Sequence, residues 1–412
     1  MEAVHSKTLT ERETRWIPVM VFAYLLLLAD GIDFLYLALS LTSLKHDFGL
    51  TDVQAGSFGS ASLAAMLVGG IVGGWACDRY GRVRSLVVAT VIFSLGTSCL
   101  GFTQDYWQFL LIRFIGSLGI GAVYVGANTL VFEYAPVKHR TTVLGTLQSG
   151  WTVGYVVASV LAGAILPHYG WRYLFFTSAV PVVLAIFMHA FIRDSDAYLE
   201  AKRKREAEAR SGAGKQPSIL RSIFDNPEQR QRFIVWTIGA TLLQFAYYGV
   251  VNWIPAYLQS QMHISFSSIA GFLIATFIAS TFAKIAAGWL ADRIGRRLMF
   301  FLASALTAVF IPIVVLYKTP DNILYLMTIF GFFYGMPYGV TATFMSESFP
   351  TDVRGSASGT AYNIGRLGGV LAPVTIGYLS AAGHIDAGFM LMAVAFLACG
   401  LVPALLIRGK TY

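Results

Sequence analysis

The chain has 412 residues, of which 56% are hydrophobic and only 13% are charged, whereas about 25% of the residues in a soluble protein are charged. Its 40 glycines are also typical of membrane helices, which contain more glycine than soluble ones. This composition excludes an ordinary soluble domain and predicts an all-α polytopic membrane protein. The three cysteines, Cys77, Cys99 and Cys399, lack the spacing of a metal site or a disulfide framework.

Twelve apolar segments recur along the chain, each long enough to cross a hydrocarbon core, which takes roughly 20 helical residues. The first six predicted spans are Trp16–Leu41, Gln54–Cys77, Leu86–Thr103, Trp107–Val131, Thr141–Ile165 and Trp171–Ile192. The last six are Phe233–Leu258, Ser265–Ala291, Leu298–Tyr317, Ile323–Met345, Gly355–Ala381 and Ala387–Ile407. No cleavable leader is expected before the first span, because its apolar run is too long for a signal peptide.

The net charge of +8 follows from where the basic residues lie. With the N-terminus placed in the cytoplasm, all but six of the 30 Lys and Arg residues fall in cytoplasmic segments. This asymmetry is typical of the positive-inside rule. We therefore expect both termini in the cytoplasm, and the basic surplus requires no nucleic-acid partner.

A long polar stretch between the sixth and seventh spans divides the chain. It predicts an N-terminal six-helix half (1–193), a cytoplasmic linker (194–230) and a C-terminal six-helix half (231–412). GWACDRYGR, from Gly74, returns as GWLADRIGR from Gly288, 214 residues later, and EYAPVKHR returns as ESFPTDVR at the same offset. Six-span halves in the same orientation are typical of a parallel repeat about an axis normal to the membrane.

The repeated motifs fall at cytoplasmic helix ends, where arginine complements the partial negative charge of a helix C-terminus. Because they lie beside the boundary between the halves, we expect them to hold the cytoplasmic face closed in one state and to release it in another. A purely structural turn is the alternative. The candidate gating residues are Asp78, Arg79, Arg82, Glu133, Arg140, Asp292, Arg293, Arg296, Glu347 and Arg354.

The two turns resemble the loop motif of the major facilitator superfamily, and RFIGSLGIG, from Arg113, resembles the fourth-helix motif of its proton-coupled members. More narrowly, ADGIDF, VFEYAP and NIGRLGG are similar to motifs of the aromatic acid:proton symporters. These short motifs also occur in neighbouring families for sialate, lactate and other carboxylates. The resemblance covers essentially the whole chain. It implies a two-half transport fold in the cell membrane, which in bacteria is the inner membrane, and we expect the protein to function as a monomer without a cofactor.

Five charged residues inside the spans have no charged counterpart in the other half: Asp30, Asp33, Arg113, Lys284 and Arg366. A charge at mid-bilayer costs roughly 2.5–3.5 kcal/mol on insertion scales, so such residues are usually retained for function. Asp30 and Asp33 share a helix face, and two close carboxylates in a low dielectric are not both expected to stay ionised. With Arg113 they are predicted to carry protons. The alternative is a static ion pair with Arg113.

The three cations outnumber the two acids, and this surplus favours an anionic substrate. Arg366 is the main candidate, since a guanidinium can bind a carboxylate through two hydrogen bonds, and the glycines of NIGRLGG allow close approach. Lys284 is the second candidate. Lys284 and Arg113 lie nearer the membrane surfaces, so snorkelling to the water boundary is the alternative for both.

Aromatic and amide side chains at similar depths are predicted to line the rest of a substrate pocket. As a group they suit a flat or small organic acid, although each one alone also fits a packing or interfacial role. They are Asn128, Gln148, Trp151, Tyr155, Gln244, Tyr247, Tyr248, Tyr334, Tyr338 and Asn363.

These features predict secondary active transport: proton-coupled uptake of a small organic anion, an aromatic or related carboxylate, by alternating access. The sequence contains no GxxxxGK[ST] loop for ATP-driven pumping. No nucleophile–base or metal constellation of an enzyme stands out at mid-membrane. The alternatives are an anion exchanger or efflux transporter on the same fold, and an anion-sensing receptor that signals through the linker.

Overall fold

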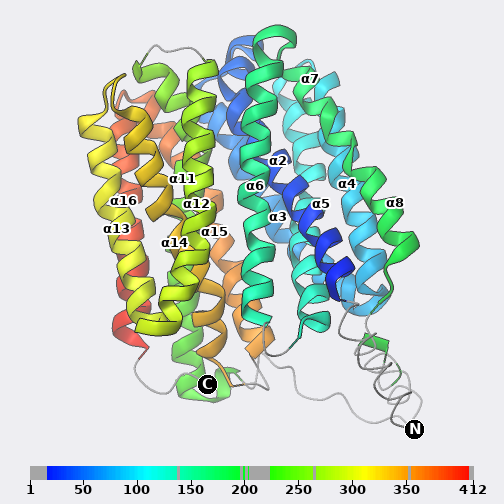
Figure 1. Ribbon diagram of the computed structural model, residues 1–412. Helices are drawn as coiled ribbons and strands as arrows, with labels where there is room; N and C mark the ends of the chain where they lie inside the picture. The colour runs from blue at the N-terminus through cyan, green and yellow to red at the C-terminus, as the bar shows by residue number, and fades with distance from the viewer. Residues whose placement is uncertain are drawn as a thin grey trace.

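The structure is a computed structural model that describes residues 16–136, 140–194, 198–199, 203, 223–262, 266–350 and 354–407. Within these residues it holds 12 helical segments long and apolar enough to cross a membrane. They stand side by side in one bundle (Figure 1). Large apolar side chains such as Ile71, Trp75, Phe187 and Phe282 are exposed on its surface, as expected where lipid covers it. The predicted all-α polytopic fold is confirmed.

The first half of the chain supplies six of these segments. They are α2 (Trp16–Phe48), α3 (Asp52–Tyr80), α4 (Arg82–Cys99), α5 (Tyr106–Tyr134), α6 (Arg140–Tyr169) and a pair of helices, α7 (Trp171–Phe176) and α8 (Pro181–Phe191). The predicted sixth span, Trp171–Ile192, is therefore not one continuous helix. A 3₁₀ turn over Thr177–Ala179 interrupts it. Pro181 then opens α8 in its first turn, where the missing amide hydrogen of proline costs no helical hydrogen bond.

The second half supplies the other six. They are α11 (Pro227–Met262), α12 (Phe266–Ile294), α13 (Arg296–Tyr317), α14 (Ile323–Glu347), α15 (Arg354–Ala381) and α16 (Ile385–Leu406). Helix α11 begins before the predicted start at Phe233, because the Asn226 side-chain oxygen accepts hydrogen bonds from the backbone N–H groups of Glu228 (3.0 Å) and Gln229 (3.3 Å). Most of the predicted linker lies outside the described residues, so the division into 1–193, 194–230 and 231–412 stays a prediction.

The two sets of six helices meet along two main contacts. Helix α3 packs against α15 and α6 packs against α12, while α2 and α11 also touch. Figure 1 shows α13 and α16 at one edge of the bundle and α4 and α8 at the other. The contact between the two halves is therefore built by α2, α3, α6, α11, α12 and α15.

Close helix contacts recur at the offset of 214 residues seen in the sequence. A Cβ atom at Gly121 would lie 2.1 Å from the carbonyl oxygen of Met66, and one at Gly335 would lie 2.5 Å from that of Ser280. Both positions need glycine, because a side chain would separate the paired helices. The two halves thus share one packing scheme, with α3 and α5 in the first matching α12 and α14 in the second.

Candidate functional site

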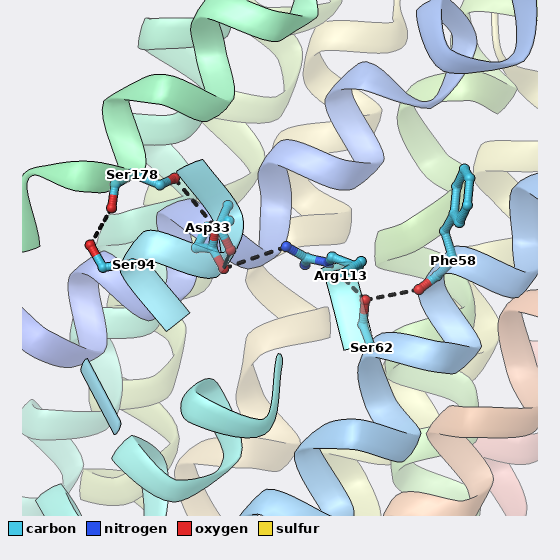
Figure 2. Close-up of polar contacts among 7 residues, drawn as sticks. Asp33, Phe58, Ser62, Ser94, Arg113 and Ser178 are labelled. Carbon is cyan, nitrogen blue, oxygen red and sulfur yellow. Dashed lines mark hydrogen bonds and ion pairs between the residues drawn. The ribbon is translucent and has the colours of Figure 1, made fainter. Parts of the chain in front are cut away.

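A buried ion pair between Asp33 of α2 and Arg113 of α5 organises the first polar cluster (Figure 2). Arg113 Nη1 lies 3.4 Å from Asp33 Oδ2, and the two side chains are 0% and 1% exposed. The carboxylate also accepts hydrogen bonds from the hydroxyls of Thr97 (2.9 Å) and Ser178 (3.3 Å), and Arg113 Nε donates to the Ser62 hydroxyl (2.8 Å). These partners replace part of the hydration that both charges lose, as a buried ion pair requires.

The break in the sixth span contributes directly to this cluster. Ser178 lies in the 3₁₀ turn between α7 and α8, and Figure 2 shows it beside Asp33 and Ser94, whose hydroxyl donates to the Ser178 carbonyl. Sequence reasoning found Asp33 and Arg113 but missed Thr97, Ser178 and Ser62. Serine and threonine hydroxyls in helices commonly bond the carbonyl one turn back, so no sequence signal marks the few that turn to an acid.

Asp30 lies one helical turn before Asp33 on α2 and is also buried, but its surroundings differ. Neither of its carboxylate oxygens has a hydrogen-bond partner among the described residues. Its charge interacts with those of Asp33 and Arg366. Because a buried polar group without a hydrogen bond is costly, Asp30 is the less well supported of the two carboxylates.

Arg366 lies on α15 and is 2% exposed. In the described part of the chain, its Nε and Nη1 atoms have no hydrogen-bond partner. The guanidinium lies 5.3 Å from the ring centroid of Tyr124 on α5, and that ring stacks on Tyr362 with centroids 6.1 Å apart. Free donors on a buried guanidinium are rare, and their planar arrangement can bind a carboxylate. The two tyrosines were not predicted.

Lys284 lies on α12 and turns towards α6. Its ammonium donates a hydrogen bond to the Thr152 hydroxyl, and no described acidic side chain forms an ion pair with it. Lys284 and Arg113 are 8% and 0% exposed, so both side chains are enclosed by the protein. The centre of the bundle therefore holds a second cation without an acidic partner.

The predicted amide residues separate into two groups. Gln148 Nε2 donates to Asn128 Oδ1 (2.8 Å), and the Tyr124 hydroxyl donates to Gln148 Oε1 (3.4 Å). Gln244 and Asn363 donate instead to backbone carbonyls, and their own side-chain oxygens have no partner within the described ranges. Gln148 and Asn128 are thus linked to Arg366 through Tyr124. Gln244 and Asn363 keep side-chain oxygens that could accept a hydrogen bond.

Some of the predicted aromatic residues form a cluster that crosses between the halves. Trp151 of α6 and Tyr248 of α11 both pack on Phe34 of α2, with ring centroids 5.9 and 5.3 Å away. Trp151 also lies 6.0 Å from the Tyr124 ring and 6.4 Å from that of Tyr155. The structure therefore brings these side chains together around the centre of the bundle.

Tyr247, Tyr334 and Tyr338 form a second aromatic group inside the second half. Tyr247 stacks on Tyr334 with centroids 4.4 Å apart and planes at 8°, and its centroid lies 4.5 Å from that of Tyr338. The Tyr334 hydroxyl donates to the Tyr247 carbonyl (2.9 Å), which suits a packing role. The hydroxyl of Tyr338 has no partner among the residues described.

The candidate gating residues form ion pairs at the end of the bundle that carries the repeated turns, here called the turn end. Arg82 pairs with Glu133 (2.9 Å), and Arg296 pairs with Glu347 (3.3 Å) and Asp292 (2.7 Å). The first pair joins α4 to α5 and the Arg296–Glu347 pair joins α13 to α14. These pairs therefore brace each half separately.

The backbone of the two turns also matches. Gly81 and Gly295 have φ angles of 108° and 94°, a region that favours glycine. Arg293 stacks on a tryptophan ring at 3.6 Å, and the Arg79 carbonyl accepts a hydrogen bond from the Tyr198 hydroxyl (3.3 Å). The candidate gating residues whose side chains lie outside the described structure are Asp78, Arg140 and Arg354.

At the opposite end of the bundle, contacts that the sequence did not predict join the two halves. Asp52 at the start of α3 accepts a hydrogen bond from the Ser380 hydroxyl of α15 (2.6 Å) and forms an ion pair with Lys45. A Cβ atom at Gly56 would lie 2.5 Å from the Pro373 carbonyl oxygen. Helices α3 and α15 are thus closed against each other at this end.

Similarity to known proteins agrees with this architecture. The chain matches the sequence profile of the Major Facilitator Superfamily over residues 21–373 and 268–411. The cis,cis-muconate transport protein of Acinetobacter baylyi is 48% identical, over 96% of this chain and 95% of that protein. The benzoate transport protein of the same organism is 25% identical, over 88% of this chain and 83% of that protein.

Solved structures show the same fold. A D-xylose–proton symporter matches with a TM-score of 0.75 at 20% identity, over 95% of this chain and 98% of that one. An inward-facing bacterial homologue of the human lysosomal transporter Spinster matches with a TM-score of 0.72 at 18% identity, over 96% and 97%. These relatives are transporters, which confirms a multi-pass membrane transporter rather than an enzyme. The chain therefore belongs to the Major Facilitator Superfamily.

Proposed function

We propose that this protein is a secondary active transporter that takes up a small organic anion, an aromatic or related carboxylate, together with protons. Its relatives support this substrate class. They include the muconate and benzoate transport proteins described above and the gentisate transporter of Corynebacterium glutamicum, which is 24% identical. The three named compounds are carboxylic acids.

The observation that carries the proposal is the buried Arg366 guanidinium, whose Nε and Nη1 atoms have no partner in the described chain. It lies where helices of both halves meet, the usual place for the ligand of a two-half transporter. Its free N–H groups suit a carboxylate. Tyr124 lies against it, Trp151 packs beside Tyr124, and Tyr248 packs with Trp151 on Phe34, so these rings offer flat apolar faces to a ring or a conjugated chain.

Proton coupling follows, in this proposal, from the charges around Arg366. Asp30 is the acid whose charge interacts with Arg366. When Asp30 takes up a proton, Arg366 loses that negative charge and can hold the carboxylate of the substrate instead. The proton and the anion then bind together, because either one alone leaves a buried charge uncompensated. The Asp33–Arg113 pair, fixed by hydroxyl partners, would break on protonation and release α2 from α5.

Alternating access requires that the two ends of the bundle open in turn. The structure closes α3 on α15 at the Asp52–Ser380 end, while the pairs of the turn end lie within single halves. We propose that the turn end faces the cytoplasm, with both termini, in a bacterial inner membrane, and that a single chain surrounded by lipid transports. The repeated turns would then meet when the Asp52–Ser380 contact breaks.

Uptake into proteoliposomes tests this function. Labelled benzoate, gentisate and cis,cis-muconate are supplied with and without an inward proton gradient. We expect one or more of them to accumulate only with the gradient, and Arg366→Ala to abolish this while Arg172→Ala, a change at an exposed arginine, does not. Uptake that ignores the gradient but needs internal carboxylate would replace symport by exchange. Binding without flux would support a receptor.

A further inference from the structure

Among the buried charged side chains in the centre of the bundle, Lys284 and Arg366 form no ion pair with an acid of the described structure. Within the described ranges, the buried charged residues of the centre are Asp30, Asp33, Arg113, Lys284 and Arg366. Two further buried arginines pair with glutamates near the turn end. Asp33 and Arg113 compensate each other. Once Asp30 carries a proton, Arg366 and a protonated Lys284 hold two positive charges without an acidic partner among the described residues.

These two cations lie at one level of the membrane. At the 214-residue offset, Arg366 corresponds to Thr152, and rotation about an axis normal to the membrane keeps depth unchanged. The Lys284 ammonium bonds Thr152, so it lies at the level of Arg366. The counterpart of Lys284 is Gly70, where a Cβ atom would lie 3.0 Å from Asn363 Oδ1 on α15, one turn before Arg366. Lys284 and Arg366 therefore occupy the two equivalent contacts between the halves, on opposite sides of the axis.

The residues that connect the two cations are aromatic or polar and uncharged. Arg366 lies over the Tyr124 ring (5.3 Å), the Tyr124 hydroxyl donates to Gln148 (3.4 Å), and Gln148 lies one turn before Thr152 on the same face of α6. Trp151, next to Thr152, lies 6.0 Å from the Tyr124 ring. Flat rings with hydrogen-bonding edges between two cations suit a planar conjugated body with a carboxylate at each end.

We propose that the transported anion is a dicarboxylate, with one carboxylate bound by Arg366 and the other by Lys284. This inference rests on the proposed function and narrows its substrate class. A monocarboxylate would leave Lys284 without an anion, so its ammonium either loses its proton or stays as a buried positive charge that is unpaired and costly in a low dielectric. A dicarboxylate that enters with one proton on Asp30 leaves none. The competing role for Lys284 is structural, as a strut between α12 and α6 through Thr152.

Two matched pairs of acids distinguish these roles. cis,cis-Muconate is compared with hexa-2,4-dienoate, which has a methyl group in place of one carboxylate, and terephthalate is compared with benzoate. Binding of each labelled acid is measured at neutral pH on purified protein in lipid nanodiscs. The variants are Lys284→Gln, which keeps a hydrogen bond to Thr152 without the charge, Lys284→Arg, which keeps the charge, and Lys318→Gln, the control outside the centre.

We expect the wild-type protein and Lys318→Gln to bind the diacid of at least one pair roughly 30-fold or more tightly than its monoacid, as the loss of one partner of a buried charge pair requires. Lys284→Gln should remove this preference with monoacid binding unchanged, and Lys284→Arg should retain most of it.

Equal binding of monoacid and diacid by the wild-type protein would overturn the dicarboxylate proposal and leave carboxylate transport standing. Equal loss of both acids in Lys284→Gln, with full thermal stability, would also overturn it. If Lys284→Gln fails to fold, the proposal is judged by the ratio of diacid to monoacid affinity in the wild-type protein and in Lys284→Arg. If none of the four acids binds, both the inference and the proposed function fail.

Discussion

Arg113 and Arg366 are both buried in the same bundle, but within the described structure only Arg113 forms an ion pair. Arg113 in the first half bonds Asp33 and Ser62. Arg366 in the second half lies against the Tyr124 ring without an ion pair, and two of its nitrogens are unpartnered in the described structure, compared with one, Nη2, in Arg113. We infer that the protein compensates the first charge itself and leaves the second for its substrate.

A second comparison, between the two halves, separates the contacts that recur from the charges that do not. The close contacts Gly121–Met66 and Gly335–Ser280 recur between the halves, and so do the pairs at the turn end. The central charges do not recur. Because a charge in the membrane is costly wherever it has no task, charges without a counterpart in the other half are the residues to test first.

The largest expected contrast is in the free energy of unfolding of the two alanine variants, Arg113→Ala and Arg366→Ala. Arg113→Ala leaves Asp33 buried and unpaired, so we expect a loss of about 3–5 kcal/mol. Arg366→Ala breaks no ion pair within the described structure, so we expect a clearly smaller loss than for Arg113→Ala. Thermal unfolding of both purified variants in the same detergent measures this. Equal drops in the unfolding midpoint would mean that Arg366 is also a structural residue.

The next effect concerns proton coupling through the Asp33–Arg113 ion pair of the first half. Asp33→Asn removes the proposed proton site but can keep hydrogen bonds to Thr97 and Ser178. We therefore expect it to abolish gradient-driven accumulation in proteoliposomes while counterflow exchange of labelled substrate persists. Full accumulation by this variant would exclude Asp33 from the proton path.

Asp30 should set the pH dependence of anion binding. In the proposed coupling, protonation of Asp30 frees Arg366 for the substrate, so wild-type affinity should fall as pH rises. Asp30→Asn imitates the protonated acid, and its affinity should stay constant over the same pH range. Titration of substrate binding at several pH values measures both. An unchanged wild-type slope in Asp30→Asn would assign the dependence to another group.

Whether a residue of this site can be predicted from the sequence depends on how far along the chain its contact partner lies. The acids, the cations and the repeated turns stand out because they are charges in apolar segments or appear twice. Ser178 does not, since its contact with Asp33 depends on the break in the sixth span. Asp52 and Ser380 are 328 residues apart, and a single sequence has no local pattern that pairs such residues.

The smallest expected effect is a difference in stability between variants of the two ion pairs at the turn end, Arg82–Glu133 and Arg296–Glu347. The side chains of Arg82 and Glu133 are 9% and 13% exposed, whereas those of Arg296 and Glu347 are 31% and 29% exposed. Glu133→Gln should therefore cost about 1–3 kcal/mol of stability, and Glu347→Gln less than about 1 kcal/mol. Thermal unfolding checks the order. If Glu347→Gln is the more destabilising, burial does not govern these pairs.

The most direct test of the account is whether Arg366 selects the substrate by charge. Binding of a carboxylate ligand and of its neutral amide is measured on purified wild-type protein and on Arg366→Ala. We expect the wild type to prefer the acid, and Arg366→Ala to lose about 2–5 kcal/mol of acid binding while amide binding changes little. A folded Arg366→Ala that still prefers the acid by the wild-type margin would contradict the assignment of Arg366 as the anion site.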